Sequence, residues 1–391
     1  MRILFATDLF YQNTAGSSNF IKQLTKGLIK NGHQVFLIAP SKQFKNTIAF
    51  EDGLTIYGIR SVIIPNLIYP AKFRVPVTAG SSKIRAIIAD IKPDVIHIQD
   101  HFMIGSKTVK EGRKLNIPLV GTNHFMPENF IHYLYPPPFA KKLIKKLAWK
   151  VFSRVYKHVD LITTPTKTAA ILIKDLGLKN PIIPISNGVN LTRFNPQNRG
   201  DYLKKRYKIS KKTRVVLFVG RLDKEKQIDI LIRAFAKMPA NVDAKLVIAG
   251  NGTERSHLLK LTKRLGIKKK VIFTGFVENK DLPYLYGMAD IFAIASIAEL
   301  QSMATMEAMA SGLPVVAAKV MALPELVHHR KNGYLFNDVD TKTLTDEMIQ
   351  ILKDPLLQKN MSYESLNIIK AHDINNTIKS YEKVYKLVCK R

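Results

Sequence analysis

The sequence predicts an α/β protein made of two domains, each built around a parallel β-sheet. Three observations support this fold class: short apolar runs alternate with helical patterns, the alternation restarts after residue 187, and 46% of the 391 residues are hydrophobic. Apolar runs without polar alternation are typical of strands buried on both faces of a parallel sheet. Their alternation with helices favours an α/β architecture, and the chain length suits two domains.

The first domain is expected to span residues 1–187. Its predicted strands are Arg2–Ala6, Gln34–Ile38, Val95–Ile98, Leu119–Gly121 and Leu161–Thr163. A helix is predicted over Ser18–Asn31, with apolar residues on one face and Gly32 as its C-cap.

The second domain is expected to span residues 188–373, after a stretch rich in Pro, Asn and Lys. Its predicted strands are Val215–Val219, Lys245–Ala249, Val271–Thr274, Ile291–Ala295 and Val315–Ala317. A further helix is predicted over Ile228–Lys237. The closing segment, 374–391, is predicted to form an amphipathic helix and is expected to pack back on the first domain. Two doubly wound domains facing each other across a cleft would bind ligands at the carboxyl ends of their strands.

The net charge of +31 comes from 61 Lys and Arg against 30 Asp and Glu. Residues 1–187 hold 26 basic and 10 acidic residues, so the surplus is spread over both halves. Such a field attracts nucleic acid, anionic lipid or phosphorylated small molecules. A uniform surplus is equally compatible with compositional bias.

The single cysteine, Cys389, excludes an intramolecular disulfide and a thiolate metal cluster. The N-terminus runs directly into a predicted strand and lacks the pattern of a signal peptide. No uncharged apolar run approaches the roughly 18 residues of a spanning helix. We therefore expect a cytoplasmic protein, with possible peripheral contact at the inner face of the cell membrane.

Two carboxylates lie in the segment Ile291–Val316. Glu299 is in the loop after a predicted strand, and Glu307 is the single charge of an apolar helix that Ser302 would cap. Amides at the start of that helix could bind an anion, and the carboxylates could bind sugar hydroxyls. Alternatively, both glutamates make ordinary structural hydrogen bonds.

Cations follow the strand Val215–Val219. Arg221, Lys224 and Lys226 come just after its end, where an arginine can clamp a phosphate and a lysine can act as a point charge. A solvated, charged turn is the alternative.

These motifs together resemble a known family. They include GRLDKEK (220–226), AGNG (249–252), FTGFV (273–277) and the Glu299–Glu307 pair leading into EAMASGLPVV, and ISNGVNLTRFNP (185–196) lies at the junction. In this order and spacing they are similar to the retaining glycosyltransferases of family 4, or group 1, which include bacterial glycolipid-forming glucosyl- and mannosyltransferases. The resemblance covers nearly the whole chain and implies the GT-B fold, two Rossmann-like domains facing across a cleft.

The resemblance implies roles for individual residues. Arg221 and Lys226 would contact the donor diphosphate, Glu299 would hold the transferred sugar, and His124 would lie beside that sugar. These four residues form the implied catalytic set. Glu307 would bind the ribose. The implied donor-binding residues are Gly16, Asn251, Val277, Leu300, Gln301, Ser302, Met303 and Glu307.

The chain departs from the family pattern at two positions. The family often has glycine where this chain has Gln227 and Ser302. The acidic string Asp338-Val339-Asp340 matches a metal signature of a different glycosyltransferase fold, and we interpret it as a chance match. We expect no metal and no cofactor, because cations and helix amides would stabilise the diphosphate.

The resemblance implies a retaining hexosyltransferase. It would move glucose or mannose from a UDP- or GDP-linked sugar to a hydroxyl acceptor, such as the membrane lipids diacylglycerol or phosphatidylinositol. One alternative is a soluble sugar transferase with a non-lipid acceptor. Another, suggested by the charge alone, is a nucleic-acid-binding protein, but no binding module is recognisable and the two glutamates would have no role. We therefore expect no nucleic-acid partner.

The acceptor side is expected to include the basic amphipathic helix Phe139–His158. A helix with this pattern can lie in an anionic membrane interface. The residues expected on the membrane or acceptor side are Lys141, Lys142, Lys145, Lys146 and Trp149. Alternatively, the helix packs its apolar side on the sheet and leaves the lysines in water; the two interpretations are compatible.

Overall fold

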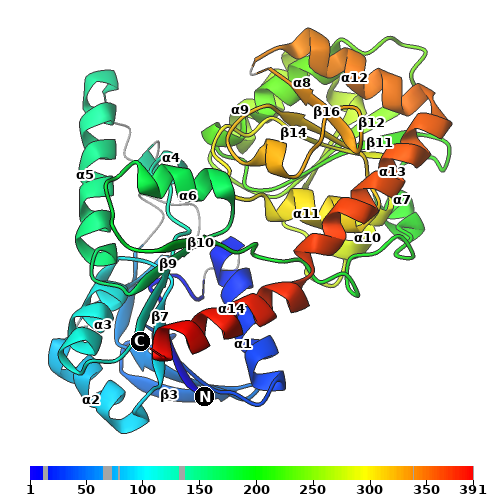
Figure 1. The fold of residues 1–391 in the computed structure, drawn as a ribbon. Helices are drawn as coiled ribbons and strands as arrows, with labels where there is room; N and C mark the ends of the chain where they lie inside the picture. The colour runs from blue at the N-terminus through cyan, green and yellow to red at the C-terminus, as the bar shows by residue number, and fades with distance from the viewer. Residues whose placement is uncertain (12–15, 65–72, 78–79, 132–136, 338, 391) are drawn as a thin grey trace. The chain divides into compact units, whose positions relative to one another are not determined.

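The computed structural model describes residues 1–11, 16–64, 73–77, 80–131, 137–337 and 339–390. The chain forms two compact units (Figure 1). Unit 1 contains residues 1–187 and 374–391, and unit 2 contains residues 188–373. The closing helix therefore belongs to the same unit as the N-terminus.

The described part of unit 1 contains an eight-stranded sheet with the order β10-β9-β8-β7-β1-β2-β4-β3. The pair β3–β4 is antiparallel and the other neighbours are parallel. The strands are β1 (Arg2–Ala6), β2 (Gln34–Pro40), β3 (Thr47–Glu51), β4 (Leu54–Ile59), β7 (Val95–Ile98), β8 (Leu119–Thr122), β9 (Leu161–Thr164) and β10 (Ile182–Pro184). A separate antiparallel ribbon joins β5 (Ser61–Ile64) to β6 (Phe73–Pro76).

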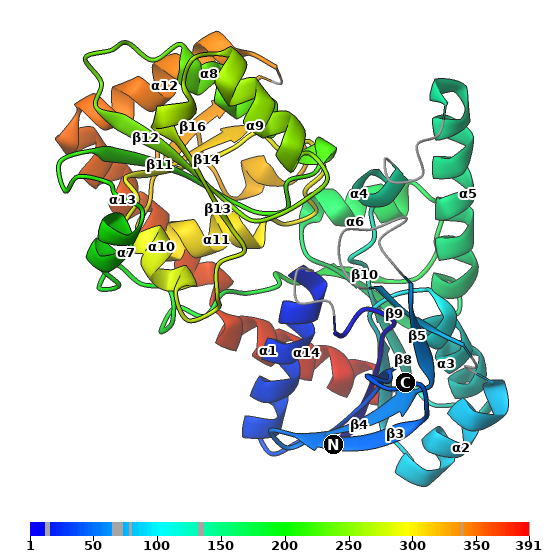
Figure 2. The same cartoon turned by 180° about the vertical axis from the view of Figure 1, so that it is seen from behind.

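Helices cover both faces of the unit 1 sheet (Figure 2). On one face, α1 (Gly16–Lys30) packs beside the closing helix α14 (Ile374–Cys389). Gly27 permits this contact, because a Cβ there would lie 2.1 Å from the Ile378 side chain. The other face is covered by α2 (Ser81–Ile91), α3 (Met103–Lys114) and α5 (Pro138–Tyr156). Two shorter helices, α4 (Glu128–Ile131) and α6 (Lys167–Lys174), complete unit 1 as described.

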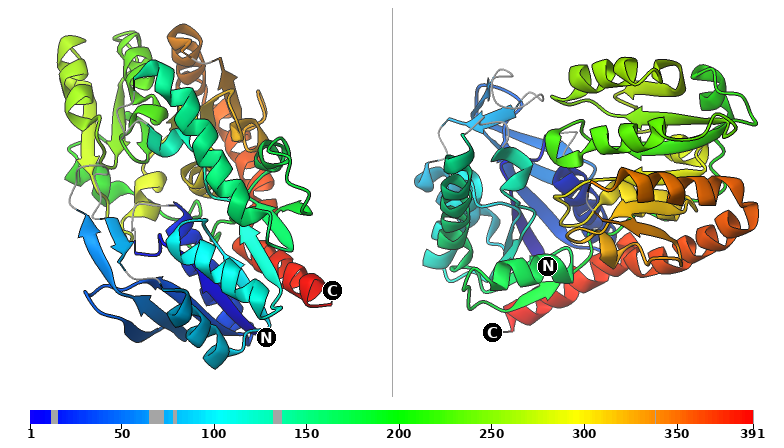
Figure 3. Two further views of the ribbon diagram at one scale, coloured as in Figure 1. Left: turned by 90° about the vertical axis from the view of Figure 1, so that its left-hand side faces the viewer. Right: turned by 90° about the horizontal axis from the view of Figure 1, so that it is seen from above.

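Unit 2 contains a six-stranded parallel sheet with the order β13-β12-β11-β14-β15-β16. The strands are β11 (Arg214–Val219), β12 (Ala244–Ala249), β13 (Val271–Gly275), β14 (Ile291–Ile294), β15 (Val315–Ala318) and β16 (Gly333–Phe336). Figure 3 gives two further views of the layers. The helices are α7 (Asp201–Arg206), α8 (Ile228–Ala236), α9 (Arg255–Arg264), α10 (Leu282–Gly287), α11 (Met303–Ala310), α12 (Thr341–Lys353) and α13 (Pro355–Ile369).

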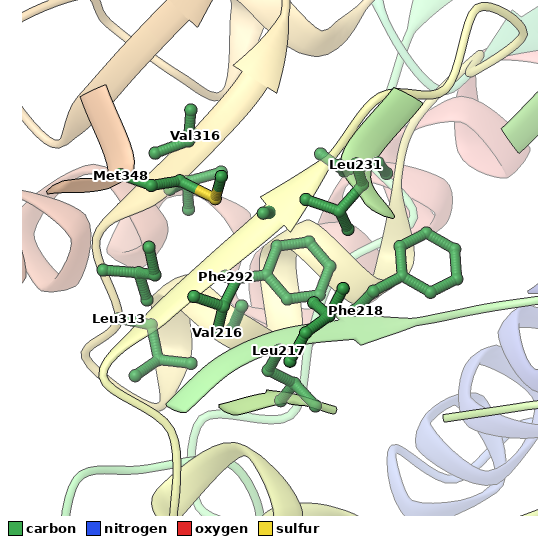
Figure 4. Packing of buried hydrophobic residues seen from close by; sticks show 14 of the residues in the cluster. Val216, Leu217, Phe218, Leu231, Phe292, Leu313, Val316 and Met348 are labelled. Atoms are coloured by element: carbon green, nitrogen blue, oxygen red, sulfur yellow. The ribbon is translucent and has the colours of Figure 1, made fainter. Parts of the chain in front are cut away.

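The core of unit 2 is apolar on both faces of its sheet. Val216 and Phe292, from neighbouring central strands, are fully buried, as are Leu231 of α8 and Met348 of α12 (Figure 4). Burial of such side chains is the main stabilising term of the unit. It also explains why these strands carry no alternation of polar residues.

Each of the two main sheets reverses its strand order once along its parallel strands. In unit 1 the chain runs from β1 to β2 and β4, and then restarts at β7 on the other side of β1. In unit 2 it runs from β11 to β13, and then restarts at β14 on the other side of β11. In a doubly wound sheet, the connections that leave the two strands at such a switch point run to helices on opposite faces, and ligands bind at the carboxyl edge there.

All ten predicted strands are present, with ends within two residues of the prediction. The prediction missed β3–β6, β10 and β16. The edge strand β3 is short, and its apolar residues Ile48 and Phe50 are exposed, so it is unlike a strand buried on both faces. β10 and β16 are only three and four residues long. The predicted helices over Ser18–Asn31, Phe139–His158 and Ile228–Lys237 correspond to α1, α5 and α8.

Candidate functional site

The loops after β11 and β14 meet at the switch point of unit 2. The carbonyl of Glu225, in the first loop, accepts hydrogen bonds from the amide of Ile297 at 3.0 Å and the hydroxyl of Ser296 at 3.4 Å. Both donors belong to the second loop. The backbone itself therefore fixes the distance between the side chains that these two loops carry.

The Lys226–Glu299 ion pair crosses the switch point. Lys226 ends the short 3-10 helix η2 (Lys224–Lys226), and its Nζ donates to Glu299 Oε1 at 2.6 Å. The side chains are 13% and 12% exposed, so the pair is largely shielded from water. The site thus holds a cation and a carboxylate in contact at the carboxyl edge of the sheet.

Arg221 is held by two carboxylates of its own loop. Its Nη1 donates to Asp223 Oδ2 at 2.6 Å, and its Nη2 donates to Glu225 Oε1 at 2.8 Å. Both acids are buried. The other oxygen of Asp223 accepts bonds from the amide and hydroxyl of Thr253, each at 3.1 Å. Arg221 is therefore fixed to the loops after both β11 and β12.

The loop after β12 packs directly on the loop after β11. The Leu222 amide donates to the Asn251 carbonyl at 3.0 Å. Gly250 has a φ of 131° and lies so close that a Cβ would be 1.9 Å from the Gly220 carbonyl oxygen, so no other residue fits. Asn251 itself is exposed, and Val277, after β13, is partly buried. Asn251 and Val277 thus follow the carboxyl ends of β12 and β13, which lie on the same side of the switch point.

Helix α11 begins where the sequence predicts. The Ser302 hydroxyl caps it by accepting from the Thr305 amide at 3.2 Å. It ends at Gly312, whose φ of 79° allows the amides of Gly312 and Leu313 to bond back to the last turn. Leu300 and Gln301 are buried just before the cap, and Met303 is partly buried in the first turn. The amides of that turn have no intrahelical carbonyl partners, which suits an anion.

Glu307 has a hydrogen-bond partner in the core. Its Oε2 accepts from the Tyr286 hydroxyl of α10 at 2.8 Å. Burial raises the pKa of Glu307 to about 7, although this hydrogen bond opposes the shift. The carboxyl group therefore changes charge near neutral pH.

In unit 1, His124 lies just beyond the carboxyl end of β8. Its Nε2–H donates to Gln99 Oε1 at 3.1 Å, and its ring lies 5.0 Å from that of Phe20 on α1, the helix that Gly16 begins. Burial lowers the pKa of His124 to about 4, so the imidazole is neutral at pH 7. The Gln99 amide also donates to His97 Nε2 at 3.0 Å.

Helix α5 has two distinct faces. Trp149 is buried and packs edge-on against Phe125 and Phe152, so it lies on the packed face and not on an exposed membrane side as expected. The exposed face carries an apolar stripe at a spacing of four residues: Phe139 (85% exposed), Leu143 (59%), Leu147 (51%) and Val151 (47%). The exposed lysines along it are Lys141, Lys142, Lys145 and Lys146, of which Lys145 pairs with Glu128. Across the described ranges, no helix has the length and apolar character to cross a membrane.

Asp340 has a structural role. Its Oδ1 accepts from the amides of Lys342 and Thr343 at 3.1 and 3.0 Å, which caps α12. Asp338 lies outside the described residues. The capping bonds account for Asp340 without a metal.

Comparison with known proteins identifies the family. Residues 201–367 match the family model described as "Glycosyl transferases group 1", and residues 14–193 match "Glycosyltransferase Family 4". The chain is 30% identical over 344 residues to an α-monoglucosyldiacylglycerol synthase of Streptococcus pneumoniae, covering 86% of this chain and 75% of that protein. The chain belongs to the glycosyltransferases of group 1. This glycosyltransferase is also 26% identical to a GDP-mannose-dependent α-mannosyltransferase of Corynebacterium glutamicum, covering 88% of this chain and 78% of that protein.

Solved structures show that the fold is GT-B. A sucrose-phosphate synthase from Thermosynechococcus elongatus superposes with a TM-score of 0.81 at 18% identity, over 99% of each chain. The Anabaena protein HepE, solved in complex with UDP-glucose, gives a TM-score of 0.77 at 19% identity, also over 99% of each chain. The predicted fold class is therefore confirmed, and the family matches above confirm the predicted enzyme class.

The structure brings some of the predicted site residues of this glycosyltransferase together. Lys226 and Glu299 are in contact, and Arg221 is linked to the same backbone junction through Glu225. Gly16 and His124 belong to unit 1. Sequence reasoning missed the partners that hold these residues, namely Asp223, Glu225, Tyr286 and Gln99. Asp223 and Glu225 were visible as acids between the cations of one short loop, but Tyr286 and Gln99 gave no local signal.

Gln227 gives a first test. It follows Lys226 and has left-handed backbone angles, φ 46° and ψ 43°. A Cβ in that region costs about 1 kcal/mol relative to glycine. Gln227→Gly and Gln227→Ala both remove the side chain beyond Cβ, and only alanine keeps the Cβ, so we expect the glycine variant to have the higher free energy of unfolding by about 1 kcal/mol. Urea denaturation of both variants measures this difference, and equal stabilities would contradict it.

Glu307 gives a second test. Folding raises its pKa from 4.5 to about 7, so the folded state binds the additional proton between these values and its stability falls as pH rises through them. Glu307→Gln removes this penalty. We expect the variant to gain thermal stability relative to the wild type at pH 8 but not at pH 4.5. Glu278→Gln, at an exposed carboxylate, is the control. A pH-independent difference for Glu307→Gln would contradict the assignment.

Proposed function

We propose that this glycosyltransferase is a retaining hexosyltransferase that moves glucose or mannose from a UDP- or GDP-linked donor to a membrane lipid such as diacylglycerol or phosphatidylinositol. The contact between Lys226 and Glu299 at the switch point carries the proposal. A cation and a carboxylate at one carboxyl edge match a ligand that combines a diphosphate with sugar hydroxyls. The activities for which the two relatives are named support glucose or mannose as the sugar and diacylglycerol as one acceptor.

In the proposed complex, Arg221 and Lys226 contact the diphosphate. The first-turn amides of Met303 and Ala304 add donors, strengthened by the helix dipole. Glu299 accepts from the hydroxyls of the transferred sugar. Leu300 and Gln301 are buried beside it, which supports a fixed backbone there.

The nucleoside half of the donor has its own proposed contacts. Glu307 accepts from the ribose hydroxyls, and the base lies near Asn251 and Val277. In unit 1, Gly16 lets the backbone approach the diphosphate closely.

Catalysis in this proposal is mainly electrostatic. The leaving group is a nucleoside diphosphate, and the cations and amides stabilise the charge that develops on it. The sugar passes through an oxocarbenium-like state, and the leaving phosphate assists the acceptor hydroxyl, which retains the anomeric configuration. Neutral His124 can hydrogen-bond a sugar hydroxyl without adding charge. We propose that no metal or cofactor takes part.

The acceptor side of the proposal rests on α5. Its exposed stripe of Phe139, Leu143, Leu147 and Val151 would enter the lipid interface, and the flanking lysines would meet anionic headgroups. The packed face, with Trp149, would remain in the protein core. The enzyme would then act at the inner face of the cell membrane, where it reaches a lipid acceptor.

A donor screen tests the function. The protein is incubated with labelled UDP-glucose, UDP-galactose or GDP-mannose and vesicles containing diacylglycerol or phosphatidylinositol. We expect one donor to yield labelled glycolipid and nucleoside diphosphate, with retained configuration by NMR. Arg221→Ala should lower kcat about 100-fold, because a transition-state contact is lost. Arg214→Ala, at an ion pair on the amino-terminal edge of the same sheet, should not.

The outcomes separate the alternatives. Label found only in an added soluble acceptor would support the non-lipid alternative. If none of the donors releases nucleoside diphosphate with either lipid, the proposed donors are wrong.

Vesicle co-sedimentation tests the membrane contact. We expect the double variant Leu143→Ser/Leu147→Ser to bind anionic vesicles about tenfold or more weakly, since each leucine contributes about 1 kcal/mol on insertion. The control is Ile171→Ser/Leu356→Ser, which removes two similarly exposed apolar side chains elsewhere. Wild-type binding should also fall as salt increases. Equal loss in both double variants would count against α5 as the contact.

A further inference from the structure

Lys226 and Glu299 are each other's partners. The 2.6 Å bond between them is the one ion pair that either side chain makes within the described ranges, and neither has a second hydrogen-bond partner there. They come from loops on opposite sides of the switch point, and each is nearly nine-tenths buried. Removing either partner would leave a shielded charge uncompensated.

Arg221 differs from Lys226 in this respect. Its two carboxylate partners, Asp223 and Glu225, lie within four residues of it and have no proposed ligand. Arg221 can keep these partners while it contacts a phosphate. Lys226, in contrast, is paired with the carboxylate that is proposed to hold the sugar. The contacts of Lys226 with phosphate and of Glu299 with sugar therefore compete with their contact with each other.

We propose that the Lys226–Glu299 pair opens when the donor binds, and that this exchange makes the site favour a nucleotide-sugar over the bare nucleoside diphosphate. The inference rests on the proposed function. A diphosphate draws Lys226 away and leaves the Glu299 carboxylate buried without a cation. A linked hexose replaces that cation with hydroxyl donors. A bare nucleoside diphosphate carries no sugar hydroxyls to replace the cation beside Glu299, so its binding free energy is reduced by the cost of the unpaired carboxylate.

The exchange has a consequence for turnover. Once the sugar has left, Glu299 loses its hydroxyl donors while the diphosphate still holds Lys226. Re-formation of the ion pair then favours release of the product. One pair of residues thus links recognition of the sugar to the affinity for the diphosphate, which is a coupling free energy between two subsites.

Glu299→Gln tests this coupling, because glutamine keeps the shape and the hydrogen-bonding oxygen but makes no ion pair. Titration calorimetry with UDP and GDP should show about tenfold tighter binding of the nucleoside diphosphate to the variant than to the wild type. Sugar transfer by the variant should be slower. If the pair had only a structural role, or if the substitution disordered the loop, the variant would bind both the nucleoside diphosphate and the nucleotide-sugar more weakly. Weaker or unchanged binding of the nucleoside diphosphate to a folded Glu299→Gln would overturn the inference.

A second measurement uses the wild type. Free glucose or mannose at high concentration supplies hydroxyls to Glu299, so it should tighten binding of UDP or GDP to the wild type but not to Glu299→Gln. Absence of this effect in the wild type would also overturn the inference.

Two controls separate the possible failures. Asp290→Asn removes a partly buried ion pair with Arg214 on the amino-terminal edge of the same sheet. It should leave the affinities for the nucleoside diphosphate and for the nucleotide-sugar unchanged. If the wild type binds neither UDP nor GDP, nor UDP-glucose or GDP-mannose, the proposed donor class is wrong, and the inference falls with it. If the wild type binds and transfers a donor but Glu299→Gln does not tighten the nucleoside diphosphate, only the inference is wrong.

Discussion

The candidate site depends on the reversal of strand order between β11 and β14. Because both strands are parallel and adjacent, their carboxyl ends lie at one edge, and their loops leave in opposite directions. The Glu225 carbonyl then ties the two loops together through Ile297 and Ser296. This backbone junction fixes Lys226 against Glu299. The side-chain chemistry is therefore a product of the topology and not of any one motif.

The charge of the site differs from that of the whole chain. The chain carries a large basic surplus, yet Arg221 and Lys226 are both neutralised by carboxylates. The surplus can raise the local concentration of an anionic ligand. In the proposed exchange, the short-range contact is selective because a ligand must replace the bond between Lys226 and Glu299, whereas Arg221 keeps its own carboxylate partners. Attraction at long range and discrimination at short range would thus rest on different charges, the overall surplus for the first and the Lys226–Glu299 pair for the second.

The features that could be predicted from the sequence are those that depend on residue type and spacing within one segment. Central strands buried on both faces, the Ser302 cap and the Gly312 terminus all follow from residue type and spacing. The strands β5 (SVII) and β6 (FRVP) were missed because each has only four residues and they pair with each other outside the two main sheets. Trp149 was placed on the wrong face because both faces of α5 carry apolar residues, and only tertiary packing decides which is buried. The Tyr286–Glu307 bond joins residues 21 positions apart, which spacing alone could not pair.

Gln227 connects the local conformation of the chain with a tertiary contact. Its left-handed backbone lies between η2 and α8, so the chain turns sharply directly after Lys226. The turn thus separates Lys226 from α8, and the Lys226 side chain reaches Glu299 on the neighbouring loop. A non-glycine residue in this conformation stores strain, and the bonds that surround the loop must offset it. The Glu225 carbonyl contacts and the Arg221 pairs provide those bonds. The loop bonds and the ion pair therefore stabilise one arrangement despite the strain at Gln227, and in it Lys226 lies beside Glu299 before any ligand arrives.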